Sequence, residues 1–333
     1  MKLSEIVVTG SSGFLGTALC QELSNLGYYV LGIDKVKPAW TPRGMMFIKK
    51  DISESNSLRK HIENRIVIHC AASVPITRVG FLGHLKNNLV GTANVVKANP
   101  QKIIFISSSA VYGSPNGKID DTTRFNSIEE YGNSKVLAEL KLLINYRINK
   151  VPTIIIRPRT IIGNARMGMM DFLFPRIMKN KPVYLIGSGN NKFQLLSLDD
   201  LIDCIIKSIT YNKKGYLELN VGTDIYSTLR KDIEFMISVV GSKSKVISLP
   251  KASRWILRVL DKLNLSPMTR WHYDTTFNDF EFDLSTVKRE LGWIPNDSNA
   301  SMLIDAYLWY AKGDKEGDTP HTKKLNKRLL EMF

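Results

Sequence analysis

Short apolar runs alternate with stretches of helical periodicity through the first half of the chain. The apolar runs are rich in Val and Ile and predict six strands, at 6–9, 29–34, 46–49, 66–69, 103–107 and 153–157, with helices between them at 17–26, 88–97 and 131–149. Near-continuous apolar strands separated by helices are typical of a parallel sheet that is covered on both faces. We therefore predict an α/β fold with a doubly wound parallel sheet of Rossmann type, whose ligands bind at the carboxyl ends of the strands.

The pattern changes after residue 158, where helices are predicted at 172–179, 198–211, 229–240 and 254–265. The last of these is strongly amphipathic, and its apolar stripe fits either a core position or peripheral contact with a membrane surface. A chain of 333 residues suits two packed domains. We predict a cofactor domain at 1–165, to which 194–225 return, and a smaller α/β substrate lobe formed by 166–193 and 226–333.

The charge balance is strongly basic, with 46 Lys and Arg against 31 Asp and Glu and a formal net charge of +15. Such an excess raises the possibility of a nucleic-acid partner. Residues 1–156, however, hold 19 basic and 11 acidic side chains, and the remaining residues hold 27 and 20. Because the charge is spread evenly, we expect small anionic ligands and no nucleic acid.

Three cysteines, Cys20, Cys70 and Cys204, lie far apart and form no CxxC pair. They predict neither a disulfide framework nor a metal site. The amino terminus does not resemble a signal peptide, and no run of 18 apolar residues could span a membrane. We therefore expect a cytoplasmic protein without a transmembrane segment.

Three glycines at three-residue spacing, Gly10, Gly13 and Gly16, separate the first strand from the first helix. Glycines in this position permit a tight turn and a close approach of the backbone to a pyrophosphate, which then meets the N-terminus of the helix. Asp34 ends the second strand, where a carboxylate can bind the adenosine ribose hydroxyls and repels a 2′-phosphate. This pattern favours NAD over NADP, although the adjacent Lys35 weakens the preference.

Tyr131 and Lys135 are four residues apart and share one face of a predicted helix. A lysine cation stabilises a nearby phenolate, so this tyrosine could exchange a proton with a substrate oxygen. Ser108 follows the fifth strand and could donate a hydrogen bond to the same oxygen. Without a catalytic role, Tyr131 and Lys135 could simply lie on a solvated helix face, and Ser108 could belong to a polar loop. His69, alone on an apolar strand, is interpreted as a core residue.

Taken in order, these motifs resemble the extended short-chain dehydrogenase/reductase superfamily, and within it the NAD-dependent epimerase/dehydratase family of nucleotide-sugar enzymes. The motifs are TGxxGFLG at 9–16, Asp34, Asp51, HxAA at 69–72, NNxxGT at 87–92, SSxxVYG at 107–113 and YxxxK at 131–135, and the similarity covers most of the chain. The resemblance implies that Tyr131 is the catalytic acid/base, that Lys135 tunes it and holds the nicotinamide ribose, and that Ser108 donates to the substrate oxygen.

The resemblance also implies a set of NAD contacts and a homodimer. The pyrophosphate would meet Gly10, Ser12, Gly13, Phe14, Leu15 and Gly16, the ribose Asp34, and the adenine Asp51 and Ile52, while Ala71, Ala72, Asn88 and Pro158 would line the cofactor together with Tyr131 and Lys135. Relatives commonly dimerise through two helices, which correspond here to 88–97 and 131–149.

Two reactions and one non-catalytic function stay open. Sugar 4,6-dehydratases of this family carry Asp-Glu after the catalytic hydroxyl, whereas this chain has Ser109 and Ala110, so we favour epimerisation through a transient hydride transfer and a keto-sugar. The segments 157–163 and 265–273 are also similar to the 3β-hydroxysteroid dehydrogenase-like branch, which makes an NAD(P)-dependent dehydrogenase or reductase of a sugar or hydrophobic alcohol the alternative. A nucleotide-sensing or RNA-binding relative typically lacks the tyrosine or lysine that this chain retains.

The substrate residues depart from the family pattern at two positions. Thr160 replaces an expected asparagine, and Phe193 occupies the position of an arginine that holds a diphosphate in relatives. Candidate substrate residues are therefore drawn from nearby polar and basic side chains, namely Ser109, Arg159, Thr160, Arg166, Lys192 and Arg270.

Overall fold

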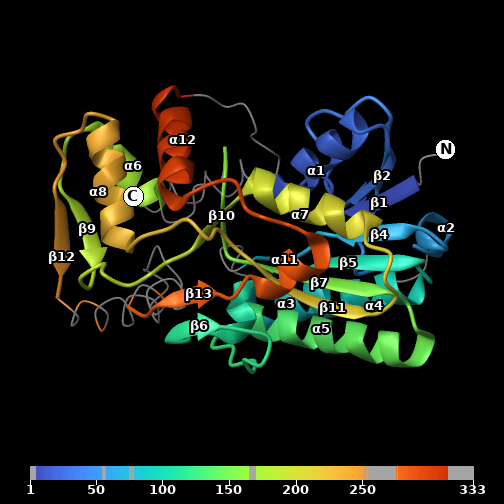
Figure 1. The fold of residues 1–333 in the computed structure, drawn as a ribbon. Helices are drawn as coiled ribbons and strands as arrows, with labels where there is room; N and C mark the ends of the chain where they lie inside the picture. Colours follow the sequence, from blue (N-terminus) through green and yellow to red (C-terminus); the bar gives the residue numbers. More distant parts are fainter. Residues whose placement is uncertain are drawn as a thin grey trace.

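A computed structural model describes residues 5–54, 58–74, 79–164, 170–250, 253, 255, 275 and 277–313 of the chain. Its centre is a seven-stranded parallel sheet in the order β11-β7-β5-β4-β1-β2-β3 (Figure 1). The strands are β1 (Glu5–Thr9), β2 (Tyr29–Asp34), β3 (Met45–Lys49), β4 (Ile66–His69), β5 (Lys102–Ile106), β7 (Thr153–Pro158) and β11 (Tyr216–Val221). The strand order reverses between β1 and β4, and in doubly wound folds ligands bind at the carboxyl ends of the strands at such a point. The predicted fold class is confirmed.

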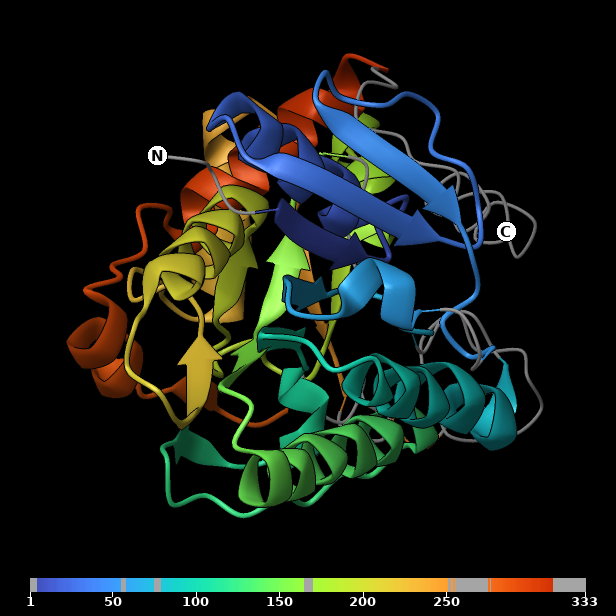
Figure 2. The same cartoon turned by 90° about the vertical axis from the view of Figure 1, so that its right-hand side faces the viewer.

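Helices cover both faces of this sheet because successive strand residues point to opposite sides. Ile104 and Ile106 join the core under α1 (Phe14–Asn25) and α7 (Leu198–Thr210). Ile103 and Phe105 pack against α5 (Glu130–Asn149) on the other face. Figure 2 shows α4 (Gly91–Lys97) and α5 side by side on that face. The face also carries α2 (Arg59–Ile62), α3 (Gly80–His84) and the π-helical segment η3 (Leu85–Val90).

A smaller lobe packs beside the large sheet and has its own core. It contains α6 (Met170–Met178), β9 (Val183–Ile186), α8 (Leu229–Val239), β12 (Val246–Leu249) and α12 (Asn299–Ala311) (Figure 1). Strands β9 and β12 pair in parallel, and Leu185, Ile233 and Leu303 are buried together between the lobe's elements. Two shorter parallel pairs connect the lobe to the sheet, namely β8 (Thr160–Ile162) with β10 (Leu195–Ser197), and β6 (Gly117–Ile119) with β13 (Phe280–Phe282).

The segment from β13 to Trp293, which includes α11 (Ser285–Leu291), belongs to the core of the large sheet. Phe280, Phe282 and Trp293 are buried in the same cluster as Ile104, and the Trp293 indole donates to the Asp200 carbonyl at 3.0 Å. The predicted division assigned this segment to the lobe, so the chain crosses between the two units more often than the sequence pattern indicated.

The amphipathic helix predicted at 254–265 and the segment 265–273 lie outside the described residues. Within the described ranges, no helix combines the length and apolar character needed to cross a membrane. The same ranges contain no cluster of His, Cys, Asp and Glu side chains suited to a metal ion.

Candidate active site

The glycine-rich loop lies directly against the carboxyl end of β4. Gly10 has a φ of +74°, and a Cβ there would stand 2.6 Å from the Ala71 nitrogen. A Cβ on Gly16 would stand 2.0 Å from the Gly10 carbonyl oxygen, so both positions require glycine. Gly13 caps α1 without a side-chain hydrogen bond, and Phe14 and Leu15 begin the helix. The N–H groups of the first turn can therefore bind a phosphate.

Asp34 is buried beside this loop at the end of β2. One carboxylate oxygen accepts the Ser12 backbone N–H at 3.1 Å and the other accepts the Val36 N–H at 2.9 Å. The Ser12 hydroxyl donates to the Val36 carbonyl at 2.6 Å and closes the turn. These bonds fix the carboxylate at the carboxyl end of β2, where doubly wound folds bind the ribose of a dinucleotide.

The predicted adenine end of the site follows β3. Asp51 accepts hydrogen bonds at 2.8 Å from both the backbone N–H and the hydroxyl of Ser53, which lower the pKa of its carboxyl although partial burial raises it. The Ile52 carbonyl accepts the Asn94 side-chain amide at 2.9 Å. A Cβ on Gly91 would stand 2.7 Å from the Ile52 side chain, so α4 approaches this loop closely.

Beyond the loop, β4 ends in small residues beside a buried histidine. Ala71 contacts Gly10, and the next residue, Ala72, is exposed. His69 is enclosed between Thr9 and Thr92, whose hydroxyls lie 2.7 Å and 3.0 Å from its two ring nitrogens. Burial, with a smaller contribution from the Lys135 charge, lowers the pKa of His69 to about 3. The ring is therefore neutral at physiological pH and serves as a packing residue.

Tyr131 and Lys135 lie in the first turns of α5, beside the end of β5. Both are buried, and the Lys135 ammonium donates to the Ile106 carbonyl at 2.8 Å and lies 4.6 Å from the centre of the Phe105 ring. Burial lowers the pKa of Lys135 to about 8, against the opposing charges of Cys70 and Glu139. The ammonium is thus fixed at the carboxyl end of β5, directly before the three serines at 107–109.

A close backbone approach places the turn after β5 against the start of α5. A Cβ on Gly132 would stand 2.6 Å from the Ala110 carbonyl oxygen and 2.2 Å from the Ser127 hydroxyl. The start of α5 therefore rests on the 3-10 turn η4 (Ser109–Tyr112), which Ser108 caps by accepting the Ala110 N–H at 3.2 Å. Ser109 is buried in this turn. The structure thus brings the segments of Ser108, Tyr131 and Lys135 to one edge of the sheet.

A hydrogen-bond network that sequence reasoning missed surrounds Tyr131. The His84 ring meets the Tyr131 ring edge-on at 5.8 Å, and its Nδ1 lies 2.8 Å from the Ser73 hydroxyl. Asn88 accepts the Ser73 N–H and donates to the Ser134 hydroxyl, each at 2.8 Å, and Ser134 donates to the Tyr131 carbonyl at 2.6 Å. Burial lowers the pKa of His84. Asn88 was predicted as a cofactor residue from the NNxxGT motif, whereas His84 was not predicted and has only its i, i+4 spacing to Asn88 as a signal.

A buried ion pair holds α5 against β7. Arg157 binds Glu139 with its Nε at 3.1 Å and its terminal nitrogen at 2.6 Å, and it donates to the Tyr112 hydroxyl at 2.8 Å. The Ser107 hydroxyl donates to the same Glu139 carboxylate. Although burial opposes it, the Glu139 charge raises the pKa of Arg157. The pair therefore holds α5, which carries Tyr131, against β7 of the sheet.

The predicted substrate residues have different surroundings. Arg159 is fully buried directly after Pro158, which ends β7. Thr160 follows in β8, and its hydroxyl is buried without a hydrogen-bond partner among the described residues. Lys192 is half-exposed and pairs with Glu281 at 3.5 Å. Arg166 and Arg270 lie outside the described residues.

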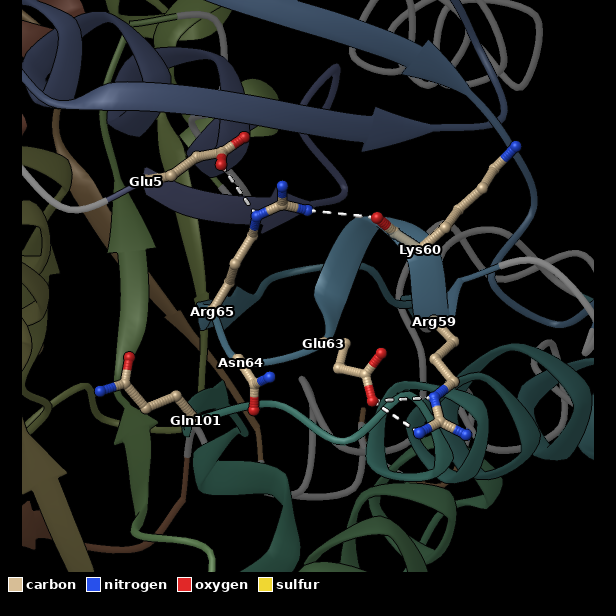
Figure 3. A pocket seen from close by; sticks show the side chains of 7 residues that line it. All are labelled: Glu5, Arg59, Lys60, Glu63, Asn64, Arg65 and Gln101. Carbon is tan, nitrogen blue, oxygen red and sulfur yellow. Dashed lines mark hydrogen bonds and ion pairs between the residues drawn. The ribbon is translucent and has the colours of Figure 1, made fainter.

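A polar groove lies at the opposite edge of the sheet, where β1 and β4 begin (Figure 3). Its arginines are paired, Arg59 with Glu63 at 2.6 Å and Arg65 with Glu5 at 2.9 Å. This groove is remote from the carboxyl ends of the strands, so the predicted chemistry does not belong to it.

Comparisons with known proteins agree with this geometry. The model of the family described as "NAD dependent epimerase/dehydratase family" matches residues 6–222. A curated protein of Sinorhizobium fredii, "Uncharacterized protein y4nG", is 30% identical over 98% of this chain and 85% of its own length. The UDP-glucose 4-epimerase of Vibrio cholerae is 27% identical over 87% of this chain and 90% of its own length.

Among solved structures, the UDP-glucuronic acid 4-epimerase from Bacillus cereus in complex with NAD superimposes with a TM-score of 0.73. It is 23% identical, and the alignment covers 92% of this chain and 99% of that one. This likeness shows that the two chains share a fold.

Proposed function

The chain belongs to the NAD-dependent epimerase/dehydratase family, and from this premise we propose that it is an NAD-dependent epimerase of a nucleotide-activated sugar. The observation that carries the proposal is the meeting of Ser108, Tyr131 and Lys135 segments at the carboxyl end of β5. The UDP-sugar epimerases among its relatives support the substrate class.

The residues of the crevice fit NAD. Gly10 and Gly16 leave no room for a side chain, Gly13 leaves the start of α1 free of a side-chain cap, and Asp34 offers a fixed carboxylate to a ribose. Asp51 and Ile52 would border the adenine, and Ser12, Phe14, Leu15, Ala71, Ala72, Asn88 and Pro158 would line the rest of the cofactor. When bound, NAD supplies the acceptor and donor for one hydride.

The chain's own residues would move the proton. Tyr131, as phenolate, would take the proton from a sugar hydroxyl while the carbon that bears this hydroxyl is oxidised to a ketone. Lys135 stabilises the phenolate electrostatically, and Ser108 donates a hydrogen bond to the substrate oxygen. After the keto-sugar has presented its other face, Tyr131 returns the proton to the oxygen, which completes the inversion without net redox change.

Epimerisation is favoured over dehydration because water elimination needs an additional acid and base. The positions that follow Ser108 are Ser109, which is buried, and Ala110, neither of which is a carboxylate. We further propose that the substrate binds between the large sheet and the lobe, and that the chain acts as a homodimer.

The decisive experiment incubates the purified protein with a panel of nucleotide sugars. We expect an isomer, resolved by nuclear magnetic resonance, without net NADH absorbance. Net NADH formation would instead identify a dehydrogenase.

Tyr131→Phe should lower turnover by about 10²–10⁴-fold while NAD binding is kept, because only the proton carrier is lost. Tyr29→Phe, at an exposed position, is the matched control. Full activity of Tyr131→Phe would refute the mechanism.

A further inference from the structure

Arg159 carries a buried cation that the rest of the described chain leaves without a hydrogen-bond acceptor. Its side chain is 1% exposed, and Nε and both terminal nitrogens have no hydrogen-bond partner among the described residues. The guanidinium lies 3.6 Å from the centre of the Phe280 ring, 4.9 Å from that of Phe193 and 5.7 Å from that of Phe282. Aromatic faces stabilise a cation, but they do not accept its N–H groups. Such an arrangement is unfavourable until an acceptor arrives.

The neighbouring polar groups are already engaged with other partners. Gln194 accepts the Phe282 N–H at 2.6 Å and donates to the Thr223 carbonyl at 2.8 Å. The Tyr226 hydroxyl donates to the Glu281 carboxylate, which also pairs with Lys192. Burial lowers the pKa of Arg159 to about 9, with Tyr226 opposing the shift, so the side chain still carries its charge at neutral pH.

The backbone around Arg159 is shaped to admit its side chain. A Cβ on Gly222 would stand 3.0 Å from the Arg159 Cγ, so glycine at this position makes room for the stem. The Arg159 N–H donates to the Val221 carbonyl at 2.8 Å, which fixes the residue at the carboxyl end of β7. This is the edge of the sheet at which ligands bind in doubly wound folds.

We propose that Arg159 binds an oxyanion of the substrate, either the diphosphate or a sugar carboxylate. Aromatic rings surround the guanidinium, and its buried N–H groups, which have no acceptor among the described residues, can form two parallel bonds to one phosphate or carboxylate. The inference rests on the proposed function, since it deepens the substrate class. It also explains why a phenylalanine occupies position 193, where relatives have an arginine that holds the diphosphate. In this chain Arg159 would supply the guanidinium, and the Phe193 ring packs against it.

Calorimetric titration of the NAD-loaded protein with UDP, UDP-glucose and UDP-glucuronic acid tests the proposal, using Arg159→Met and Arg159→Lys. If the diphosphate is the ligand, Arg159→Met should bind all three about 100-fold more weakly, and Arg159→Lys should lie between it and the unchanged protein. If the carboxylate is the ligand, only the preference for UDP-glucuronic acid over UDP-glucose should disappear.

Thermal unfolding separates binding from a structural role. Without nucleotide, Arg159→Met should melt at the same or a higher temperature, because an apolar side chain replaces an unpaired buried cation. If the diphosphate is the ligand, the rise in melting temperature that UDP induces should be lost; if the carboxylate is the ligand, only the additional rise with UDP-glucuronic acid should be lost. Arg289→Met, at an exposed arginine on α11, is the control. Unchanged binding of all three ligands by Arg159→Met would overturn the inference and leave the epimerase proposal intact. Failure of the unchanged protein to bind any nucleotide sugar of the panel used in the activity assay would overturn both.

Discussion

The buried histidine at the end of β4 shows how the environment of one residue makes stability depend on pH. His69 has both ring nitrogens beside threonine hydroxyls, and burial, helped by the Lys135 charge, lowers its pKa to about 3. The ordinary value is about 6.5. Above pH 6.5 the ring is neutral in both folded and unfolded chains, and its contribution to stability is fully present. Between pH 6.5 and 3 only the unfolded chain takes up the proton.

Protonation of His69 in the unfolded chain should therefore lower the free energy of unfolding by about 1.4 kcal/mol for each pH unit between pH 6.5 and 3. Urea unfolding at pH 7, 6, 5 and 4 measures the slope. His69→Gln should be less stable at pH 7, because two hydrogen bonds are disturbed, but its stability should fall less steeply on acidification. Equal slopes in both proteins would contradict the assignment of this proton.

Individual residues were predictable from the sequence where their chemistry depends on a local motif. Gly10 and Asp34 stand at strand ends, and Tyr131 precedes Lys135 by four residues on one helix, so their positions followed from local patterns. The isolation of Arg159 was not predictable. It depends on the Phe280 and Phe193 rings, which reach it from segments far away in the sequence.

At the scale of elements, the start of α5 is positioned by the absence of one side chain. A methyl group on Gly132 would meet the Ala110 carbonyl at 2.6 Å, so Gly132→Ala should shift the start of α5, and Tyr131 with it, away from η4. A misplacement on the order of 1 Å costs about 100-fold in rate. We expect turnover to fall by about that factor while NAD affinity changes little.

Gly215→Ala is the matched control for this change, because a Cβ there has no heavy atom within 4 Å. It should leave turnover unchanged. Steady-state kinetics of both variants, with NAD binding measured by fluorescence, provide the comparison. Equal turnover in the two variants would show that the close contact at Gly132 does not position the tyrosine.

Six strands of the large sheet were predictable to within one residue at each end because each is a continuous apolar run between polar segments, whereas the short strands of the two-stranded pairs were not predicted. Strand β11 was missed, since Glu218 and Asn220 interrupt its apolar pattern. The helix predicted at 88–97 is preceded without a break by α3 and η3. Two glycines in α3, Gly80 and Gly83, weaken the helical signal there, and packing against α5 compensates for it.

At the scale of the whole molecule, α5 presents an apolar stripe to the outside. Leu137, Leu140, Ile144 and Ile148 are exposed at spacings of three and four residues, with Ile148 72% exposed. Such a stripe on a helix is typical of a covered interface. It lies on one of the two helices through which the sequence predicts a homodimer.

We expect the protein to sediment as a dimer and Ile144→Glu to sediment as a monomer, because a carboxylate would be desolvated in the interface. Phe235→Glu, at an exposed apolar position on α8 of the lobe, should remain dimeric. Sedimentation velocity distinguishes the two. A dimer that persists in Ile144→Glu would place the interface elsewhere.

The pairing of β6 with β13 has a consequence for the order in which the chain folds during synthesis. Phe280, Phe282 and Trp293 complete a core whose other members, including Tyr112 and Ile119, emerge from the ribosome much earlier. At about 5–20 residues per second, the interval between the end of β11 and Trp293 is roughly 4 to 14 seconds. For that time the nascent sheet lacks the side chains that close this part of its core, so its apolar residues stay exposed to solvent until the last segment is made.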